Sequence, residues 1–317
     1  MFKASPDAPI VAVGAATMDL VGRAFTSRVP GDSTPGQLLL SPGGVARNVA
    51  QALAQMGCAV ELVSVVGDDV FGSQITSSTL AAGVNTQSVR VVAGSRTASY
   101  LALLEPDGSL AWAINDMQIL ELLTPEILAK QAQDLQNAAC WVLDCNLPER
   151  TLAWLFGRAT SCPVTVDGVS AAKVSRLLPW LGQIDLLKLN RLEAAALTGL
   201  AVESLEQAMV TAQVLKAKGV GRVVITMGSL GACWCNAQGR TGYLPVSPNT
   251  QEAQADTLGN SNSNSNSNSN GAGDALFAGL LAALGQGRSF DAAMASAMVC
   301  AARTRAGFKI DRTTIGL

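Results

Sequence analysis

The sequence predicts an α/β fold: a doubly wound, mostly parallel sheet flanked by helices, with a small β lid. Short runs rich in β-branched residues alternate with longer helical segments, the order expected when strands and crossover helices build one sheet. Strands such as Val223–Thr226 are apolar throughout, as expected when helices cover both faces of a sheet. Of the 317 residues, 49% are hydrophobic and 15% are charged, which is enough apolar material for a large core.

The expected elements follow one another along the chain. Strands are predicted at residues 10–14, 61–66, 141–144, 164–167, 186–189, 222–226 and 232–235. Helices are predicted at residues 46–56, 72–82, 124–137, 148–159, 205–218, 272–284 and 290–304. In the helix at 272–284, Leu276, Leu280 and Leu284 recur at every fourth position, which indicates a buried helix.

Two regions break this alternation and predict the lid. Residues 20–42 and 88–116 carry short strand-like pieces and turns such as Pro35-Gly36 and Pro106-Asp107-Gly108, with no helix. We expect them to form a two-part β lid over the carboxyl ends of the sheet strands, within a single domain spanning residues 1–317. Because exposed edge strands invite pairing, this lid also predicts a homodimer.

A third segment stands apart by composition. Residues 260–270 alternate Asn and Ser without an apolar residue to bury, which predicts a flexible loop or an expanded repeat.

Composition excludes several classes of function. Lys plus Arg number 22 and Asp plus Glu 24, giving a net charge of −2, which argues against a nucleic-acid or anionic-membrane footprint. Histidine is absent, so no Ser-His-Asp triad or histidine metal site can exist. The seven cysteines are odd in number and include no C-x-x-C pair, which predicts reduced thiols in a cytoplasmic protein. Apolar runs stay short of the roughly 20 residues that cross a bilayer, and residues 10–18 are interpreted as a strand, not a signal peptide.

The strongest functional signal is Gly271-Ala272-Gly273-Asp274, directly before the buried helix. Glycines at a helix start leave backbone N–H groups open to an anion, and the helix N-terminus adds about half a positive charge. A carboxylate beside a bound phosphoryl group and an attacking hydroxyl describes a phosphoryl-transfer site. Taken alone, the same four residues also fit an ordinary glycine-eased helix start.

Other polar residues lie where open α/β sheets bind ligands. Gly43 and Gly44 open a helix that carries Asn48 in its first turns, and Asp19 follows the first strand. Asn190 and Glu193 come after the strand at 186–189, at the carboxyl end of the sheet. Each of these also fits a cap or a turn. A further glycine-bearing turn follows another strand at Thr226, Gly228 and Gly231, and no G-x-x-x-x-G-K-[ST] phosphate loop occurs.

Together these motifs resemble those of the ribokinase-like (PfkB) carbohydrate kinases. PGGxxxN stands at residues 42–48, VGDDxFG at 66–72, NxxE at 190–193, TxGxxG at 226–231 and GAGD at 271–274. Within that family the chain is most similar to the pseudouridine kinases, above all in AINDM at 113–117 and VDGVSAAK at 166–173. The resemblance runs from residue 10 to about residue 305.

The resemblance implies ATP-dependent phosphorylation of a ribosyl 5′-hydroxyl, with Mg²⁺ and a stimulating K⁺. Asp274 would accept the hydroxyl proton, and Gly271, Ala272 and Gly273 would form the anion hole. The implied substrate-binding residues are Asp19, Gly43, Gly44, Asn48, Tyr100, Asn115, Asp116 and Asn146. The implied nucleotide-binding residues are Lys188, Asn190, Glu193, Thr226, Gly228, Gly231, Met298 and Ala301. Glu193 would act on Mg²⁺ through water, and Asp256 and Thr257 would lie near the monovalent cation.

The chain departs from the family pattern at a few positions. Thr17 stands where the family has Asn, and Gly168 and Leu189 stand where it has Pro. Deleting residues 260–271 would restore the familiar DTLGAGD, so the Asn-Ser repeat is interpreted as an insertion at the rim of the anion hole.

Three functions remain open at this point. The main hypothesis is a nucleoside kinase acting on pseudouridine, favoured by Tyr100, Asn115 and Asp116, which suit a base more than a bare sugar. The first alternative is a kinase for another nucleoside or a free sugar such as ribose or fructose. The second is a non-catalytic binding homologue that lost turnover through the insertion.

Overall fold

The computed structural model describes residues 8–27, 31–131, 135–159, 162–246 and 271–316. The Asn-Ser repeat, Asp256 and Thr257 lie outside these residues.

In the described residues, nine strands form a large sheet with the order β13-β12-β11-β10-β9-β8-β1-β4-β5. Neighbours are parallel from β11 to β5, whereas β11, β12 and β13 pair antiparallel. The strands are β1 (Ile10–Val13), β4 (Val60–Gly67), β5 (Val89–Val92), β8 (Cys140–Asp144), β9 (Val164–Asp167), β10 (Leu186–Asn190), β11 (Val223–Thr226), β12 (Ala232–Cys235) and β13 (Thr241–Leu244).

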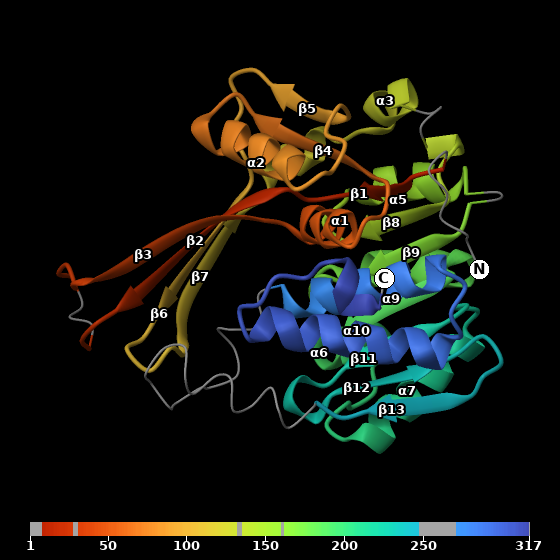
Figure 1. The fold of residues 1–317 in the computed structure, drawn as a ribbon. Coiled ribbons are helices and arrows are strands. Elements are labelled where there is room, and N and C mark those ends of the chain that lie inside the picture. The colour runs from red at the N-terminus through yellow and green to blue at the C-terminus, as the bar shows by residue number, and fades with distance from the viewer. Residues whose placement is uncertain (1–7, 28–30, 132–134, 160–161, 247–270, 317) are drawn as a thin grey trace.

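Helices cover both faces of this sheet (Figure 1). They are α1 (Val45–Gln55), α2 (Val70–Ala81), α3 (Pro125–Leu128), α5 (Glu149–Phe156), α6 (Arg191–Thr198), α7 (Leu205–Ala217), α9 (Ala272–Gly285) and α10 (Phe290–Arg305). Short 3₁₀ helices are η1 (Gln118–Leu122), η2 (Ala129–Gln131), η3 (Val174–Gln183), η4 (Gly228–Leu230) and η5 (Arg312–Ile315). Ile10 and Ala12 pack in the cluster with α1, α9 and α10, while Val11 and Val13 pack in the cluster with α5, α6 and α7. Successive strand residues face opposite layers, so fully apolar strands are what this sandwich requires.

A second sheet of four strands projects from the large one, as Figure 1 shows at the left. Its order is β3-β2-β6-β7, with β2 (Thr17–Ala24), β3 (Gly36–Gly43), β6 (Ser99–Leu104) and β7 (Leu110–Asp116). We call it the small sheet. β1 is followed closely by β2, so the polypeptide passes straight from the core into the small sheet. The predicted fold class is confirmed.

The structure differs from the expected elements in several places. Residues 89–92 form β5, which pairs with β4 in the large sheet, so the start of the 88–116 range is not part of the small sheet. A helix was expected at 124–137. The structure has the short helix α3 at its start, followed directly by the 3₁₀ turn η2. α6, η3 and β13 were not expected; α6 is short, and η3 contains Pro179, which blurs the helical pattern.

Two further findings bear on the class of protein. All seven cysteines are free thiols. Among the described residues, none of the helices has the length and apolar character that crossing a membrane requires.

The contact between α9 and α10 leaves no room for a methyl group at Gly279. A Cβ there would lie 2.6 Å from the Cys300 Sγ and 3.2 Å from the Ala297 Cα. An unstrained Gly→Ala change in a helix stabilises by about 0.5–1 kcal/mol. We expect Gly279→Ala instead to lower the free energy of unfolding by about 1–3 kcal/mol in urea denaturation, because the core is overpacked. Gly182→Ala is the control, since nothing lies within 4 Å of its added Cβ; equal effects of both variants would contradict the prediction.

Candidate active site

The candidate site lies at the carboxyl ends of β1, β8, β9 and β10, which are neighbours in the large sheet. The N-termini of α1 and α9 meet there, because Asn48 in α1 donates a hydrogen bond of 2.9 Å from its Nδ2 to Oδ2 of Asp274 in α9. These residues are 226 positions apart in the sequence. The PGGxxxN and GAGD motifs therefore belong to one site.

Asp274 occupies the first turn of α9. Burial raises the pKa of its carboxyl, and the neighbouring Asp167 raises it further, while Lys188 and the hydrogen bond from Asn48 oppose the shift. A carboxylate with a raised pKa is a stronger base than an ordinary aspartate.

The start of α9 has the geometry of an anion hole. Gly271 precedes the helix with φ 92°, a left-handed conformation that favours glycine. The first N–H groups of an α-helix have no acceptor within the helix, so those of Ala272, Gly273 and Asp274 are open to an anion. A Cβ on Gly273 would lie 3.0 Å from the Lys188 Nζ, so the ammonium group stands beside these N–H groups.

Lys188 is a buried cation among carboxylates. Its Nζ lies 2.9 Å from Oδ2 of Asp167, and their side chains are 8% and 2% exposed. Asp167, Glu193 and Asp274 all raise the pKa of Lys188 above its ordinary value, although burial opposes them. The ammonium group is therefore charged at every working pH and supplies a fixed positive charge next to the anion hole.

Asn190 and Glu193 form the capping box of α6. The Asn190 side chain accepts from the backbone N–H of Leu192 and Glu193, and the Glu193 carboxylate accepts from the Asn190 backbone and side-chain N–H groups. Burial raises the pKa of Glu193, while Lys188 opposes the shift. The capping box therefore holds both side chains in one geometry at the end of β10.

The two missing prolines are structurally linked. A Cβ on Gly168 would lie 2.6 Å from Cδ2 of Leu189 and 2.9 Å from Oε2 of Glu193. The side chains of Leu189 and Glu193 therefore occupy the space that a larger residue at position 168 would need.

On the substrate side, Asp19 lies against the glycine turn. A Cβ on Gly43 would lie 2.2 Å from Oδ2 of Asp19, and Gly44 has φ 96° with its added Cβ 2.4 Å from the Ala15 carbonyl. Thr17, where the family has Asn, donates its hydroxyl to Oδ1 of Asp19 at 3.0 Å. Burial raises the pKa of Asp19.

The register of the small sheet places two of the predicted lid residues beside Asp19. Asp19 pairs with Tyr100, which pairs with Asn115, so the three lie in one row on one face. Burial and the Asp19 charge raise the pKa of the Tyr100 hydroxyl. Asp116 lies in the adjacent row with Met18 and Ser99, which faces the other side. The register therefore separates Asp116 from the residues it was grouped with.

The loop after β8 carries Asn146. Two cationic residues that the sequence analysis did not place in the site bind this loop. Lys173 donates to Oδ1 of Asn146 at 2.6 Å. Arg176 donates to the carbonyls of Cys145 at 3.0 Å and Leu147 at 2.9 Å. VDGVSAAK thus contributes Lys173 at its end in addition to Asp167 and Gly168 at its start.

Asp144 is a third residue that the sequence analysis did not place in the site. Its buried carboxylate accepts hydrogen bonds from the backbone N–H of Ala15 at 2.9 Å, Ala46 at 3.1 Å and Asn146 at 2.9 Å. A Cβ on Gly14 would lie 2.5 Å from this carboxylate. Its only signal in the sequence is a charge at the end of an apolar strand.

The residues predicted to line the nucleotide lie on the other side of β10. Thr226 ends β11 and its hydroxyl donates to the Leu189 carbonyl at 3.4 Å. Gly228 and Gly231 flank the turn η4, with φ of 60° and 99°. Met298 and Ala301 are half-buried on α10, whose Thr304 lies 3.8 Å from the position of a Cβ on Gly271. The last turns of α10 thus stand next to the anion hole.

Within the described residues, no three or more acidic, cysteine or histidine side chains are grouped so as to hold a metal ion. A magnesium ion commonly uses only one or two carboxylates together with substrate phosphates. Asn190 and Glu193 fit that role through water.

A buried carboxyl on the first turn of a helix, beside helix N–H groups and a buried cation at the carboxyl edge of an α/β sheet, is the arrangement expected of a phosphotransferase of ribokinase-like fold. The chain belongs to the pfkB family of carbohydrate kinases, whose sequence profile matches residues 7–307. It is thus an ATP-dependent phosphotransferase of the class that acts on sugars and nucleosides. The predicted family is confirmed.

Individual relatives of known sequence or structure agree with this family assignment. The chain is 36% identical over 292 residues to a pseudouridine kinase of Escherichia coli (strain K12), covering 92% of this chain and 88% of that protein. It is 33% identical over 305 residues to the uncharacterized sugar kinase YeiI of the same organism, covering 96% and 80%. The structure of Arabidopsis thaliana ribokinase complexed with ribose and ATP shares the fold, with a TM-score of 0.81, 21% identity and 97% coverage of both chains.

We expect Asp274→Asn to stabilise the protein without ligands at pH 8. Folding raises the pKa of Asp274, so the ionised carboxyl destabilises the folded state above that pKa, and the cost disappears as the pH falls toward the unfolded value. At about 1.4 kcal/mol per pKa unit, the gain should be roughly 1–3 kcal/mol at pH 8 and shrink toward zero near pH 4. Denaturant unfolding across this pH range measures it. Asp107→Asn, at an exposed turn, should show no such gain, and a gain for Asp274→Asn that is independent of pH would contradict the electrostatic explanation.

Proposed function

We propose that the chain transfers the γ-phosphoryl group of ATP to the ribose 5′-hydroxyl of a nucleoside, with pseudouridine as the substrate. The observation that carries the phosphoryl-transfer part is the hydrogen bond between Asn48 and Asp274 at the mouth of the anion hole. It brings a substrate-side polar group and a base of raised pKa to one point. The similarity to a pseudouridine kinase supports the choice of substrate.

In the proposed reaction, the 5′-hydroxyl oxygen attacks the γ-phosphorus, Asp274 accepts the hydroxyl proton, and the bond to the leaving ADP breaks. The N–H groups of Gly271, Ala272 and Gly273 donate hydrogen bonds to the oxygens of the transferring phosphoryl group and stabilise its negative charge. Lys188 adds a fixed positive charge next to Gly273. Proton transfer is helped because burial makes Asp274 more basic than a surface aspartate.

The substrate would lie between the glycine turn and the small sheet. Asp19, Gly43, Gly44 and Asn48 are suited to ribose hydroxyls, because a carboxylate and an amide accept and donate next to an unobstructed backbone. Tyr100 and Asn115 share the Asp19 row and are suited to the base. Asn146 enters from the loop after β8, with Lys173 bound to it.

The nucleotide would lie along β10 and β11, near Thr226, Gly228 and Gly231, with Met298 and Ala301 beside adenine. Mg²⁺ would neutralise phosphate charge when bound, held by the phosphates and, through water, by Asn190 and Glu193. K⁺ near Asp256 and Thr257 is part of the same proposal.

The decisive experiment incubates the full chain with Mg-ATP and pseudouridine, uridine, adenosine, ribose or fructose, and identifies phosphorylated products by mass spectrometry. We expect pseudouridine 5′-phosphate, and we expect Asp274→Asn to lower kcat by about 10²–10⁴-fold, as loss of a general base does. Glu149→Gln, an exposed change at the start of α5, is the control that should keep full activity. Full activity of Asp274→Asn would refute the assignment of the base.

Other outcomes would correct the proposal in defined ways. Product from ribose or fructose alone would favour the sugar-kinase alternative, which the likeness to a sugar kinase supports. No product from any compound, with ligand binding retained, would favour the binding homologue. A chain lacking residues 260–271 would then show whether the Asn-Ser insertion is responsible.

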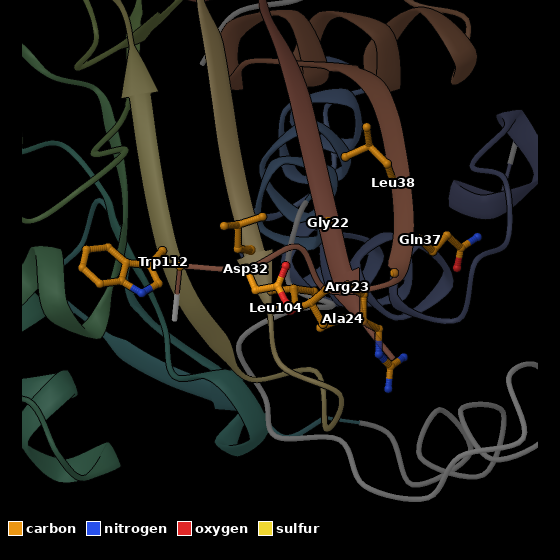
Figure 2. A pocket seen from close by; sticks show the side chains of 12 residues that line it. Gly22, Arg23, Ala24, Asp32, Gln37, Leu38, Leu104 and Trp112 are labelled. Carbon is orange, nitrogen blue, oxygen red and sulfur yellow. The ribbon is translucent and has the colours of Figure 1, made fainter. Parts of the chain in front are cut away.

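We also propose that the small sheet pairs two copies of the chain. One face carries two apolar rows that cross all four strands: Leu40, Leu20, Leu101 and Ile114, and Leu38, Gly22, Leu103 and Trp112. Leu38, Trp112 and Ile114 are 60%, 64% and 63% exposed. A pocket of about 810 Å³ at the outer end of the small sheet is lined by Gly22, Leu38 and Trp112 of these rows among others, as Figure 2 shows. Exposed apolar rows of this extent favour burial against a second copy.

Ile114→Lys should convert the dimer into a monomer in sedimentation velocity, because it places a charge in the middle of the apolar rows. Val210→Lys is the matched control, since Val210 is 54% exposed on α7, far from the small sheet in the sequence and in another layer. A wild-type chain that sediments as a monomer would refute the proposed dimer.

A further inference from the structure

Arg47 is a buried cation that the proposed mechanism does not use. It lies in the first turn of α1 and is 5% exposed. Its Nη1 donates to the Pro42 carbonyl at 2.9 Å and its Nε to the Thr79 hydroxyl at 3.1 Å. Burial lowers the pKa of Arg47 to about 10, although Asp19 opposes the shift. Burying a charge is costly, so the contacts it makes are of functional interest.

A third contact links Arg47 to the catalytic base. Nη1 of Arg47 also donates to Oδ1 of Asn48 at 3.1 Å. An asparagine amide has one accepting end and one donating end, whereas a guanidinium can only donate. Because Arg47 holds the oxygen of the amide, the nitrogen must point the other way, toward Asp274.

We propose that Arg47 is a positioning residue that fixes the orientation of the Asn48 amide, so that its nitrogen is held against Asp274 in the geometry required for phosphoryl transfer. The role of Asp274 in this inference rests on the proposed function. The hydrogen bonds that connect Arg47, Asn48 and Asp274 are observed independently of it. The same guanidinium binds Pro42, directly before Gly43 and Gly44, so it sets the substrate turn and the base together.

The charges around Asp274 allow this inference to be tested. From the packed elements, Asp274 faces Asp167 of β9, Lys188 of β10, Asp144 of β8 and the amide of Asn48. Arg47 reaches Asp274 through the Asn48 amide, which accepts from Arg47 at its oxygen and donates to Asp274 at its nitrogen. An effect of Arg47 that passes through this amide should vanish when the amide is absent.

A double-mutant cycle with Arg47→Met and Asn48→Ala tests this dependence. We expect Arg47→Met to lower kcat by about 10–100-fold, as a misplacement of about 1 Å does, with little change in the KM for ATP. In the Asn48→Ala background the same substitution should have little further effect, because coupled residues are not additive. If the fold-losses in kcat of the two single variants multiply in the double variant, the proposal is overturned.

Two controls separate positioning from general loss of structure. Arg288 is another guanidinium bound to a hydroxyl, that of Ser296 at 3.0 Å, and to a carbonyl, that of Ile315. Arg288→Met should leave kcat unchanged in folded protein. If Arg47→Met does not fold, Arg47→Lys and Thr79→Val are used in the same cycle; only the first alters the donor to Asn48, so only the first should show coupling to it.

A second measurement is independent of turnover. The ¹³C resonance of the Asp274 carboxyl, identified by its loss in Asp274→Asn, is titrated with pH. Loss of the hydrogen bond from the Asn48 amide should raise the pKa of Asp274. We expect this rise in Arg47→Met, where the amide is no longer held, and in Asn48→Ala, where it is absent, with no further rise in the double variant. If wild-type chain phosphorylates none of the compounds, the proposed function fails while this titration still decides the inference. An unchanged pKa in Arg47→Met would overturn it.

Discussion

The buried carboxylate of Asp144 holds the site in place. It accepts hydrogen bonds from backbone N–H groups just after β1, at the start of α1 and in the loop after β8. Burial raises its pKa and these three hydrogen bonds oppose the rise, so the charged form depends on all three partners. A side chain at position 14 would meet this carboxylate, so the close approach of Asp144 to the end of β1 requires glycine there. The start of α1, which carries Asn48, is held to the core by the same carboxylate through Ala46.

The other half of the site is governed by an excess of negative charge. Asp167, Glu193 and Asp274 surround one cation, Lys188, and burial keeps water from screening them. Without a bound anion this arrangement makes Asp274 more basic at the expense of stability, which is a common property of active sites. In the proposed reaction, the first N–H groups of α9 stabilise an incoming phosphate rather than Asp274 itself. The proposed base and the proposed anion hole thus share one buried helix start.

Much of this could be predicted from local sequence. Fully apolar strands, the glycine turn before Asn48 and the GAGD helix start each carry their signal within a few residues. Asp144, Arg47 and Lys173 were missed because their partners lie far away: Asp144 binds Ala15 from 129 residues along the chain. Asp116 lies on the opposite face from Tyr100 and Asn115 because side chains alternate between faces, so one position along β7 reverses the direction. β5 was assigned to the lid because a four-residue strand carries no sign of which sheet it joins.

The departures from the family pattern show why single positions mislead when they are judged alone. The absence of two prolines suggests two loosened loops, yet Leu189 fills the space beside Gly168 and Glu193 lies against the same glycine. One change accommodates the other, and the capping box of Asn190 and Glu193 stays intact. Thr17 likewise replaces an expected Asn but still donates to Asp19. In each case the neighbouring residues accommodate the change, so a departure from the motif has to be judged from the contacts that the new residue makes.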